Sequence, residues 1–168
     1  MIVARMIRSP GYACRVPRSS PIALLRHDLP DGTSHVDLLI GAWDRPAGDE
    51  DRTVPCWRCP QRPDRSEGAF AALRIERIGD HRGLYLRLQA PRDLGGGRGT
   101  VTPLRAGTGT SDRSPEEGGR IAVTWSDGGQ SHWSLEPTGG PEWTLRPLAA
   151  EIDGPIPNPL PTAPRSTP

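Results

Sequence analysis

The sequence contains no lysine: all 21 basic residues are arginines, set against 20 acidic residues. The net charge of +1 gives the chain no overall basic field of the kind that draws proteins onto nucleic acid. Codon usage in a GC-rich genome, which favours Arg, Gly, Pro and Ala, explains this composition without a functional cause. Arginine also suits two-pronged contacts to phosphate better than lysine does, so phosphate binding stays open as a function.

Cysteine and long apolar stretches are scarce as well. An odd, low number of cysteines does not make a disulfide framework; the three are Cys14, Cys56 and Cys59. No stretch approaches the roughly 20 apolar residues that a membrane span needs. Arg5 and Arg8 interrupt the N-terminus where a signal peptide would need an apolar core. We therefore expect a cytoplasmic, reduced protein with no membrane partner.

The apolar share of 34% is low, and the 20 glycines and 20 prolines are many for a chain of 168 residues. Part of the chain is therefore expected to lie outside the core. The distribution of proline and glycine predicts a loose N-terminal extension over 1–20, one domain over 21–150, and a Pro-rich disordered tail over 151–168.

Short apolar runs separated by turn residues fill the central domain and favour strands. The clearest period-two pattern is in Leu84–Leu88, where leucines alternate with polar residues. Residues 69–77 fit helix or strand, with helix favoured by propensity, and 106–119 have the composition of a loop. The pattern predicts a mainly β protein, a small closed or partly open β-barrel (or a sandwich) with short helical elements. The predicted strands are 22–26, 35–40, 54–59, 84–88, 100–104, 121–125, 132–135 and 143–148.

One group of side chains has the composition of a metal site. His35 and Asp37 are two residues apart on a predicted strand and therefore share a face. His27 ends the preceding strand, so a hairpin would bring it near His35. Imidazole and carboxylate ligands suit Mn, Fe or Zn. On spacing alone, a hydrogen-bonded histidine beside a surface aspartate is the commoner arrangement.

Two further patterns carry possible chemistry. His81 and Tyr85 are four residues apart on a predicted strand, and histidine, tyrosine and arginine together suit an oxyanion such as phosphate; a solvated strand face is the commoner outcome. Cys56-Trp57-Arg58-Cys59 is a single CxxC without the second pair that a zinc ribbon needs. We interpret it as a chance pair, with Trp57 in the core.

Taken in order, these motifs resemble the 3′-phosphoesterase domain of bacterial DNA ligase D and its short stand-alone relatives. The resemblance covers about residues 21–148. It comprises His27-Asp28, His35-Val36-Asp37, the Trp57 strand ending at Pro60, Asp80-His81 with Tyr85, Gly95-Gly96-Gly97-Arg98-Gly99-Thr100-Val101, Gly107-Thr108, and Trp143-Thr144-Leu145.

The resemblance implies a compact β-barrel with a metal ion, usually manganese, held by His27, His35 and Asp37. It places His81 and Tyr85 at the phosphate as catalytic residues. The implied function is a metal-dependent phosphoesterase acting on 3′ ends of DNA or of an RNA/DNA primer–template in DNA repair, in company with other end-joining proteins.

Three positions depart from the family pattern. The turn between His27 and His35 is two residues longer, Leu25 stands where Gln is common, and Leu39 stands where active members carry a phosphate-binding Arg. An arginine restored at 39 is expected to raise activity, and Arg58, Arg62 or Arg87 are candidates to replace it. Leu39 also supports a second hypothesis, a non-catalytic module that binds a nucleic-acid end or a repair partner.

Overall fold

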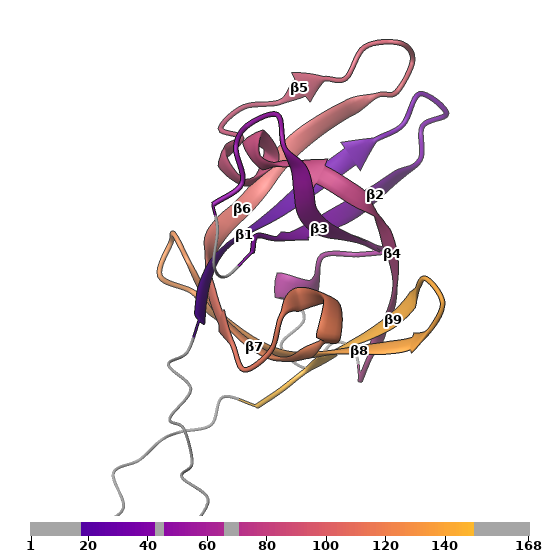
Figure 1. Ribbon diagram of the computed structural model, residues 1–168. Coiled ribbons are helices and arrows are strands. Elements are labelled where there is room, and N and C mark those ends of the chain that lie inside the picture. Colours follow the sequence, from indigo (N-terminus) through magenta and orange to yellow (C-terminus); the bar gives the residue numbers. More distant parts are fainter. Residues whose placement is uncertain (1–17, 43–45, 66–70, 150–168) are drawn as a thin grey trace, which may run out of the picture.

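The computed structural model describes residues 18–42, 46–65 and 71–149. Nine strands and three short 3-10 helices make up this part of the chain (Figure 1). They are β1 Arg18–Asp28, β2 Ser34–Ile40, β3 Arg52–Cys59, η1 Pro63–Arg65, β4 Leu73–Arg82, η2 Gly83–Arg87, β5 Arg92–Asp93, β6 Thr100–Ser111, η3 Pro115–Glu117, β7 Gly119–Trp125, β8 Gln130–Gly139 and β9 Glu142–Pro147.

Eight of these strands close into an antiparallel barrel in the order β1-β2-β3-β4-β9-β8-β7-β6, because β6 returns to pair with β1. The two-residue β5 lies outside the barrel and pairs with β6. The predicted β-barrel is therefore confirmed and is the closed form. No helix in the described part of the chain has the length and apolar character that crossing a membrane requires.

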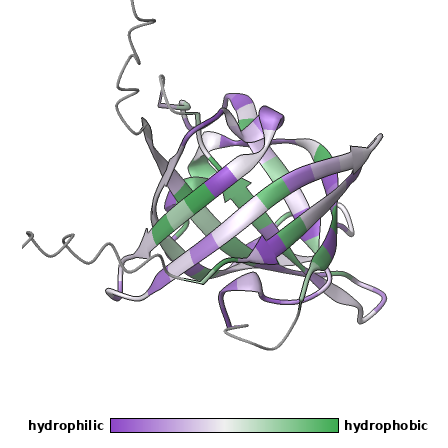
Figure 2. Ribbon diagram, turned by 90° about the horizontal axis from the view of Figure 1, so that it is seen from below, coloured by the Kyte–Doolittle hydropathy of each residue, from purple (hydrophilic) through white to green (hydrophobic). Residues whose placement is uncertain are grey.

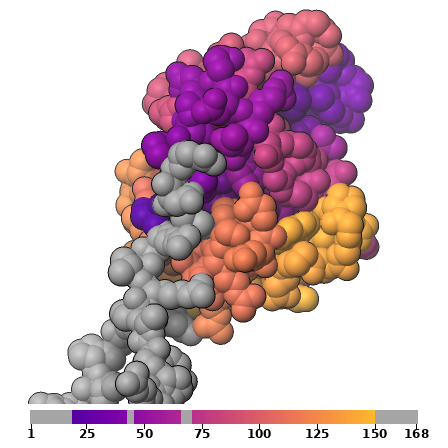
Figure 3. Space-filling model, viewed as in Figure 1, coloured from indigo at the N-terminus to yellow at the C-terminus, as the bar shows by residue number. Residues whose placement is uncertain are grey.

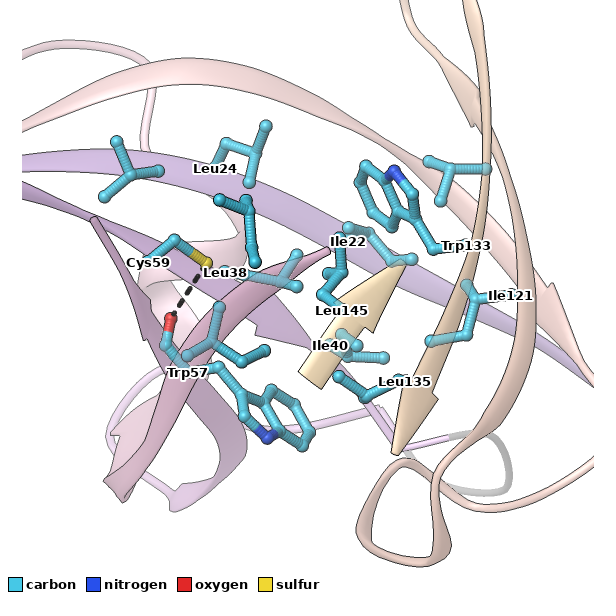
Figure 4. Packing of buried hydrophobic residues seen from close by; sticks show 14 of the residues in the cluster. Ile22, Leu24, Leu38, Ile40, Trp57, Cys59, Ile121, Trp133, Leu135 and Leu145 are labelled. Carbon is cyan, nitrogen blue, oxygen red and sulfur yellow. Dashed lines mark hydrogen bonds between the residues drawn. The ribbon is translucent and has the colours of Figure 1, made fainter. Parts of the chain in front are cut away.

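The barrel interior is filled by one apolar cluster, the inner cluster. Two pairs of tryptophans meet edge to face within it: Trp57 with Trp143 at 5.5 Å between ring centroids, and Trp125 with Trp133 at 5.9 Å. Trp57 is fully buried, as predicted (Figure 4). The members are Ile22, Leu24, Val36, Leu38, Ile40, Trp57, Cys59, Leu73, Ile75, Ile121, Val123, Trp125, Trp133, Leu135, Trp143 and Leu145.

A second apolar cluster, the outer cluster, lies on the opposite face of β1, β2, β3 and β6. Alternate residues of these strands supply it, since neighbours along a strand point to opposite faces. Figure 2 shows apolar and polar residues interleaved around the barrel wall. The helix η2 covers this face and contributes Leu86. The members are Ala23, Leu25, Leu39, Val54, Cys56, Leu86 and Val101.

The predicted strand at 84–88 is wrong, because this segment is η2. The strand β4 ends at Arg82, and the backbone N–H groups of Gly83 and Leu84 then donate to the carbonyls of Asp51 and Asp49. Gly83 lies so close to the 46–51 loop that a Cβ there would stand 2.3 Å from the Gly48 carbonyl oxygen. The alternating leucines were too few to separate a strand from a helix of three residues per turn.

Two other segments differ from the sequence-based expectation. Residues 73–77 form the start of β4, a strand rather than the helix that propensity favoured, because β3 and β9 pair with it on either side. The strand β1 begins at Arg18, inside the expected extension over 1–20. Residues 1–17 and the expected tail over 151–168 lie outside the described residues.

The predicted loop over 106–119 is also mostly wrong, since β6 continues to Ser111 and η3 follows. Glycine composition suggested a loop, but the glycines serve close packing within the barrel. A Cβ on Gly107 would stand 2.4 Å from the Thr124 carbonyl oxygen, and one on Gly109 would stand 2.2 Å from Ile22 Cδ1. Glycine in a strand commonly marks such close approach.

Gly107→Ala is therefore expected to destabilise the barrel by about 1–3 kcal/mol, because the obstacle is backbone and cannot move aside as a side chain could. Urea unfolding of the purified protein measures this. Gly79→Ala on β4 is the control, since a Cβ there has no atom within 4 Å and costs no strain. Equal stability of the Gly107 variant and the parent would show that β6 and β7 can separate without cost.

Candidate metal centre

The β1–β2 hairpin places His27 directly opposite His35. The two residues are partners in the antiparallel register, and their ring centroids lie 5.0 Å apart. The longer turn is closed by a hydrogen bond from the Leu29 N–H to the Thr33 carbonyl oxygen. Asp31 holds it further by accepting from the Thr33 N–H and hydroxyl at 2.9 and 2.6 Å. These contacts hold the turn between His27 and His35 in one conformation.

Asp37 is the centre of the group. Its side chain follows His35 on the same face of β2 and is 1% exposed. Its two carboxyl oxygens face different histidines: Oδ1 lies 3.3 Å from His35 Nε2, and Oδ2 lies 3.7 Å from His81 Nε2. One buried carboxyl group therefore links the hairpin to the end of β4.

Two of these atoms are buried without a hydrogen-bond partner among the described residues: His35 Nε2 and Asp37 Oδ1. Buried polar atoms are nearly always paired, because an unpaired one costs free energy. Two ligand atoms bound at about 2.1 Å to a tetrahedral ion lie about 3.4 Å apart, close to the 3.3 Å observed here. The ligand atoms of His27, His35 and Asp37 all lie within 4.8 Å of one another. These residues fit a divalent transition ion.

Backbone carbonyls fix the orientation of two of the imidazoles. His27 Nε2–H donates to the Arg98 carbonyl oxygen at 2.8 Å, which leaves Nδ1 with a free lone pair. His81 Nδ1–H donates to the Gly79 carbonyl oxygen at 3.0 Å, which leaves Nε2 facing Asp37. Histidines that bind metals usually donate their other N–H in this way, since the bond sets the tautomer.

The pKa of His35 lies below its ordinary value, mainly because burial penalises the charged imidazolium and despite the opposing effect of Asp37. The nearby Arg58 and the other two histidines lower it further. His35 is thus neutral near pH 7, the form that binds metal ions.

Acidification is expected to destabilise the metal-free fold as pH falls through about 6.5, the pKa of an unfolded histidine. Below that pH the unfolded chain takes up a proton at His35 that the folded chain resists, so the free energy of unfolding decreases. Urea unfolding between pH 7.5 and 5 measures the slope. His35→Gln should flatten it; an unchanged slope in this variant would assign the pH dependence to other groups.

Cys56 is a residue that sequence reasoning missed. Its thiol, with Asp37 and His81, forms a second group whose ligand atoms lie within 4.8 Å of one another. Burial, with Asp37 nearby, raises the pKa of this thiol well above its ordinary value. Cys56 lies in the outer cluster and Cys59 in the inner one, so the CxxC thiols point to opposite faces and cannot chelate one ion together. Alternation along β3 from Trp57 could have placed Cys56 on the face of Asp37.

His81 and Tyr85 do meet, although the expected shared strand does not exist. His81 is near the end of β4, Tyr85 is in η2, and their ring centroids lie 5.8 Å apart. The turn at Gly83 brings the two rings together. Both line a pocket of about 180 Å³, together with His27 and Asp37. The hairpin, β3 and the β5–β6 region meet at this end of the molecule (Figure 3).

Arginine reaches this pocket from positions that the sequence did not suggest. The pocket is lined by Arg52, Arg82, Arg92 and Arg98. The three expected candidates are instead paired with carboxylates outside it: Arg58 with Glu76, Arg62 with Asp64, and Arg87 with Asp49. Leu39 does follow Asp37 on the outer face, but it is fully buried in the outer cluster and does not line the pocket.

Comparison with known proteins adds no relative from which a function could be transferred. No protein-family model matches the chain, and no curated protein matches it. A functional conclusion therefore depends on the chemistry of the histidines, Asp37 and the arginine-lined pocket.

Proposed function

We propose that the chain is a metal-dependent phosphoesterase that acts on 3′ ends of nucleic acid, in the manner of the ligase D phosphoesterase domains that its motifs resemble. One observation carries the proposal: His35 Nε2 and Asp37 Oδ1 are buried 3.3 Å apart without a hydrogen bond among the described residues, and Asp37 also lines a pocket that arginines line. Metal and phosphate chemistry account for both features at once.

His27, His35 and Asp37 would hold the ion through Nδ1, Nε2 and a carboxyl oxygen. Two nitrogens and one oxygen suit Mn, Fe or Zn, and manganese is the ion that the resemblance implies. When bound, the ion supplies Lewis acidity toward a phosphoryl oxygen. The backbone contact at His27 and the burial of Asp37 keep these ligands in place before substrate arrives.

His81 and Tyr85 act on the phosphate ester in this proposal. With Nδ1–H held by the Gly79 carbonyl, protonated His81 can donate from Nε2 to a phosphate oxygen or to the leaving oxygen. Tyr85 packs against the His81 ring and lines the same pocket, so its hydroxyl can orient the phosphate. DNA or RNA/DNA primer–template ends are the proposed substrates, and end-joining repair proteins the proposed partners.

Leu39 favours a second candidate, a module that binds a nucleic-acid end without turnover. The side chain is fully buried among apolar residues, so no guanidinium reaches the phosphate from this position. Such a module would keep the metal and the pocket but lack sufficient stabilisation of the transition state.

Turnover on a 3′-phosphorylated oligonucleotide with Mn²⁺ separates the two candidates. The parent protein is expected to release inorganic phosphate, and His81→Gln to release it far more slowly while binding the ion as the parent does. The same oligonucleotide with a 5′-phosphate and a free 3′-hydroxyl is the substrate control. Binding of the 3′-phosphorylated end with no phosphate release would support the non-catalytic module and contradict the phosphoesterase.

A further inference from the structure

The arginines that line the pocket come from two sides of the metal centre. On one side, Arg92 is in register with Val101, which is itself in register with His27, so Arg92 lies two strand spacings, about 10 Å, from His27 along the sheet. On the other side, Arg52 pairs with Arg82 at the ends of β3 and β4. The pocket is thus flanked by arginines of β5 and the turn that follows it on one side, and of β3 and β4 on the other.

The guanidinium groups of these four arginines differ in the partners that they already have within the protein. Arg82 pairs with Glu50 at 3.0 Å. The Arg98 guanidinium donates to the Leu94 and Gly95 carbonyls, and its own carbonyl accepts from His27. Arg52 and Arg92 are exposed, and their guanidinium groups form no ion pair or hydrogen bond with any residue in 18–42, 46–65 or 71–149. Their charge is available to a ligand.

Ion pairing is the commoner state of the arginines that the structure describes. Most of them form ion pairs, such as Arg26 with Asp28, Arg74 with Glu142 and Arg146 with Glu136. The one carboxylate beside Arg92 that lines the pocket, Asp93, accepts a hydrogen bond from the Gly95 N–H. Two unpaired guanidinium groups at one pocket suit an anion with several oxygens, since each offers planar donors.

The pocket is also small. Its volume of about 180 Å³ is below the roughly 300 Å³ at which pockets begin to enclose drug-sized molecules. This volume is enough for a phosphate group but not for a phosphate together with a base and a sugar. Tyr85 and His81 are the only described rings besides His27 on its lining, and the two already pack on each other.

We infer that Arg52 and Arg92 form the phosphate-binding part of this pocket and that recognition ends at the phosphate, leaving base and sugar outside. The inference deepens the proposed function and rests on it for the position of the phosphate beside the metal centre. Arg52 and Arg92 then supply the guanidinium groups for phosphate binding, because position 39 carries a leucine and not an arginine. The substrate class is a terminal phosphate, and the base and sugar that carry this phosphate are recognised only weakly.

Calorimetric titration of the full chain with inorganic phosphate, with and without Mn²⁺, tests the binding site. Arg52→Gln/Arg92→Gln is expected to weaken phosphate binding by about tenfold to a hundredfold, because each lost charge-assisted hydrogen bond is worth about a factor of ten or more. Arg74→Gln/Arg146→Gln removes the same charge from ion pairs elsewhere and should change affinity less than threefold. Phosphate affinity retained by the Arg52/Arg92 variant would overturn the assignment.

Competition tests the limit of recognition. The four 3′-phosphorylated mononucleotides should displace inorganic phosphate with equal affinity within about threefold, and the unphosphorylated nucleosides should not displace it. A tenfold preference for one base would overturn the second half of the inference. Phosphate binding without turnover would contradict the proposed function but support the binding site. Turnover that is unaffected in the Arg52/Arg92 variant would support the proposed function but contradict the binding site.

Discussion

Replacing both His35 and Asp37 with alanine is expected to abolish stoichiometric binding of a divalent transition ion, and with it any hydrolysis of a 3′-phosphate. The reason is that the variant loses two of three ligands. One of them is the Asp37 carboxyl group, which also belongs to the second possible set of metal ligands, with Cys56 and His81. Metal content measured by mass spectrometry after dialysis is the readout. Full retention of the ion would contradict the site.

The matched control is His132→Ala, which removes the remaining histidine on β8, away from the hairpin. Cobalt substitution adds a second readout, since a thiolate ligand gives charge-transfer absorption and imidazole and carboxylate ligands do not. Absence of that absorption is expected for His27, His35 and Asp37. Its presence, and its loss in Cys56→Ser, would move the ion to the set with Cys56 and His81.

Leu39→Arg is expected to lower the free energy of unfolding by more than about 3 kcal/mol, because it puts an unpaired charge into an apolar site. The side chain is 0% exposed and packs in the outer cluster beneath η2. This expectation replaces the one from sequence, in which arginine at this position raises activity. Urea unfolding monitored by tryptophan fluorescence measures the loss.

Leu39→Met serves as the control, since a swap of similar volume costs less than about 1.5 kcal/mol. The arginine variant fails as a test of catalysis if it unfolds, but stability itself is the quantity predicted. A folded Leu39→Arg protein within 1 kcal/mol of the parent, with faster turnover, would show that the guanidinium reaches the phosphate after all.

The strands of the barrel could be predicted where apolar and turn residues alternate sharply. Runs such as His35–Ile40 and Ile121–Trp125 lie within β2 and β7 because each strand buries one or both faces. Prediction from sequence failed where contacts of the backbone determine the structure. Gly83 against the Gly48 carbonyl converts a leucine alternation into η2, and Gly107 keeps a glycine-rich segment inside β6.

The candidate site could likewise be predicted only in part from the sequence. His27, His35 and Asp37 could be brought together from sequence because a hairpin fixes their register. The arginines could not, because Arg52 and Arg92 approach through strands far apart in the chain and no local spacing links them. The spacing from Asp37 placed Leu39 on the correct face of its strand. The sequence did not predict the helix η2, so it could not show that Leu39 is buried beneath this helix.

The separation of the inner cluster from the face that carries the histidines has an evolutionary consequence. The tryptophans that hold the barrel closed lie on one side of the wall, and His27, His35, Asp37 and the arginine-lined pocket lie on the other. Substitutions in the pocket therefore leave the tryptophan packing intact, so the residues of the pocket can change while the scaffold persists. Descendants of one such barrel can diverge in what the pocket binds without passing through an unfolded ancestor.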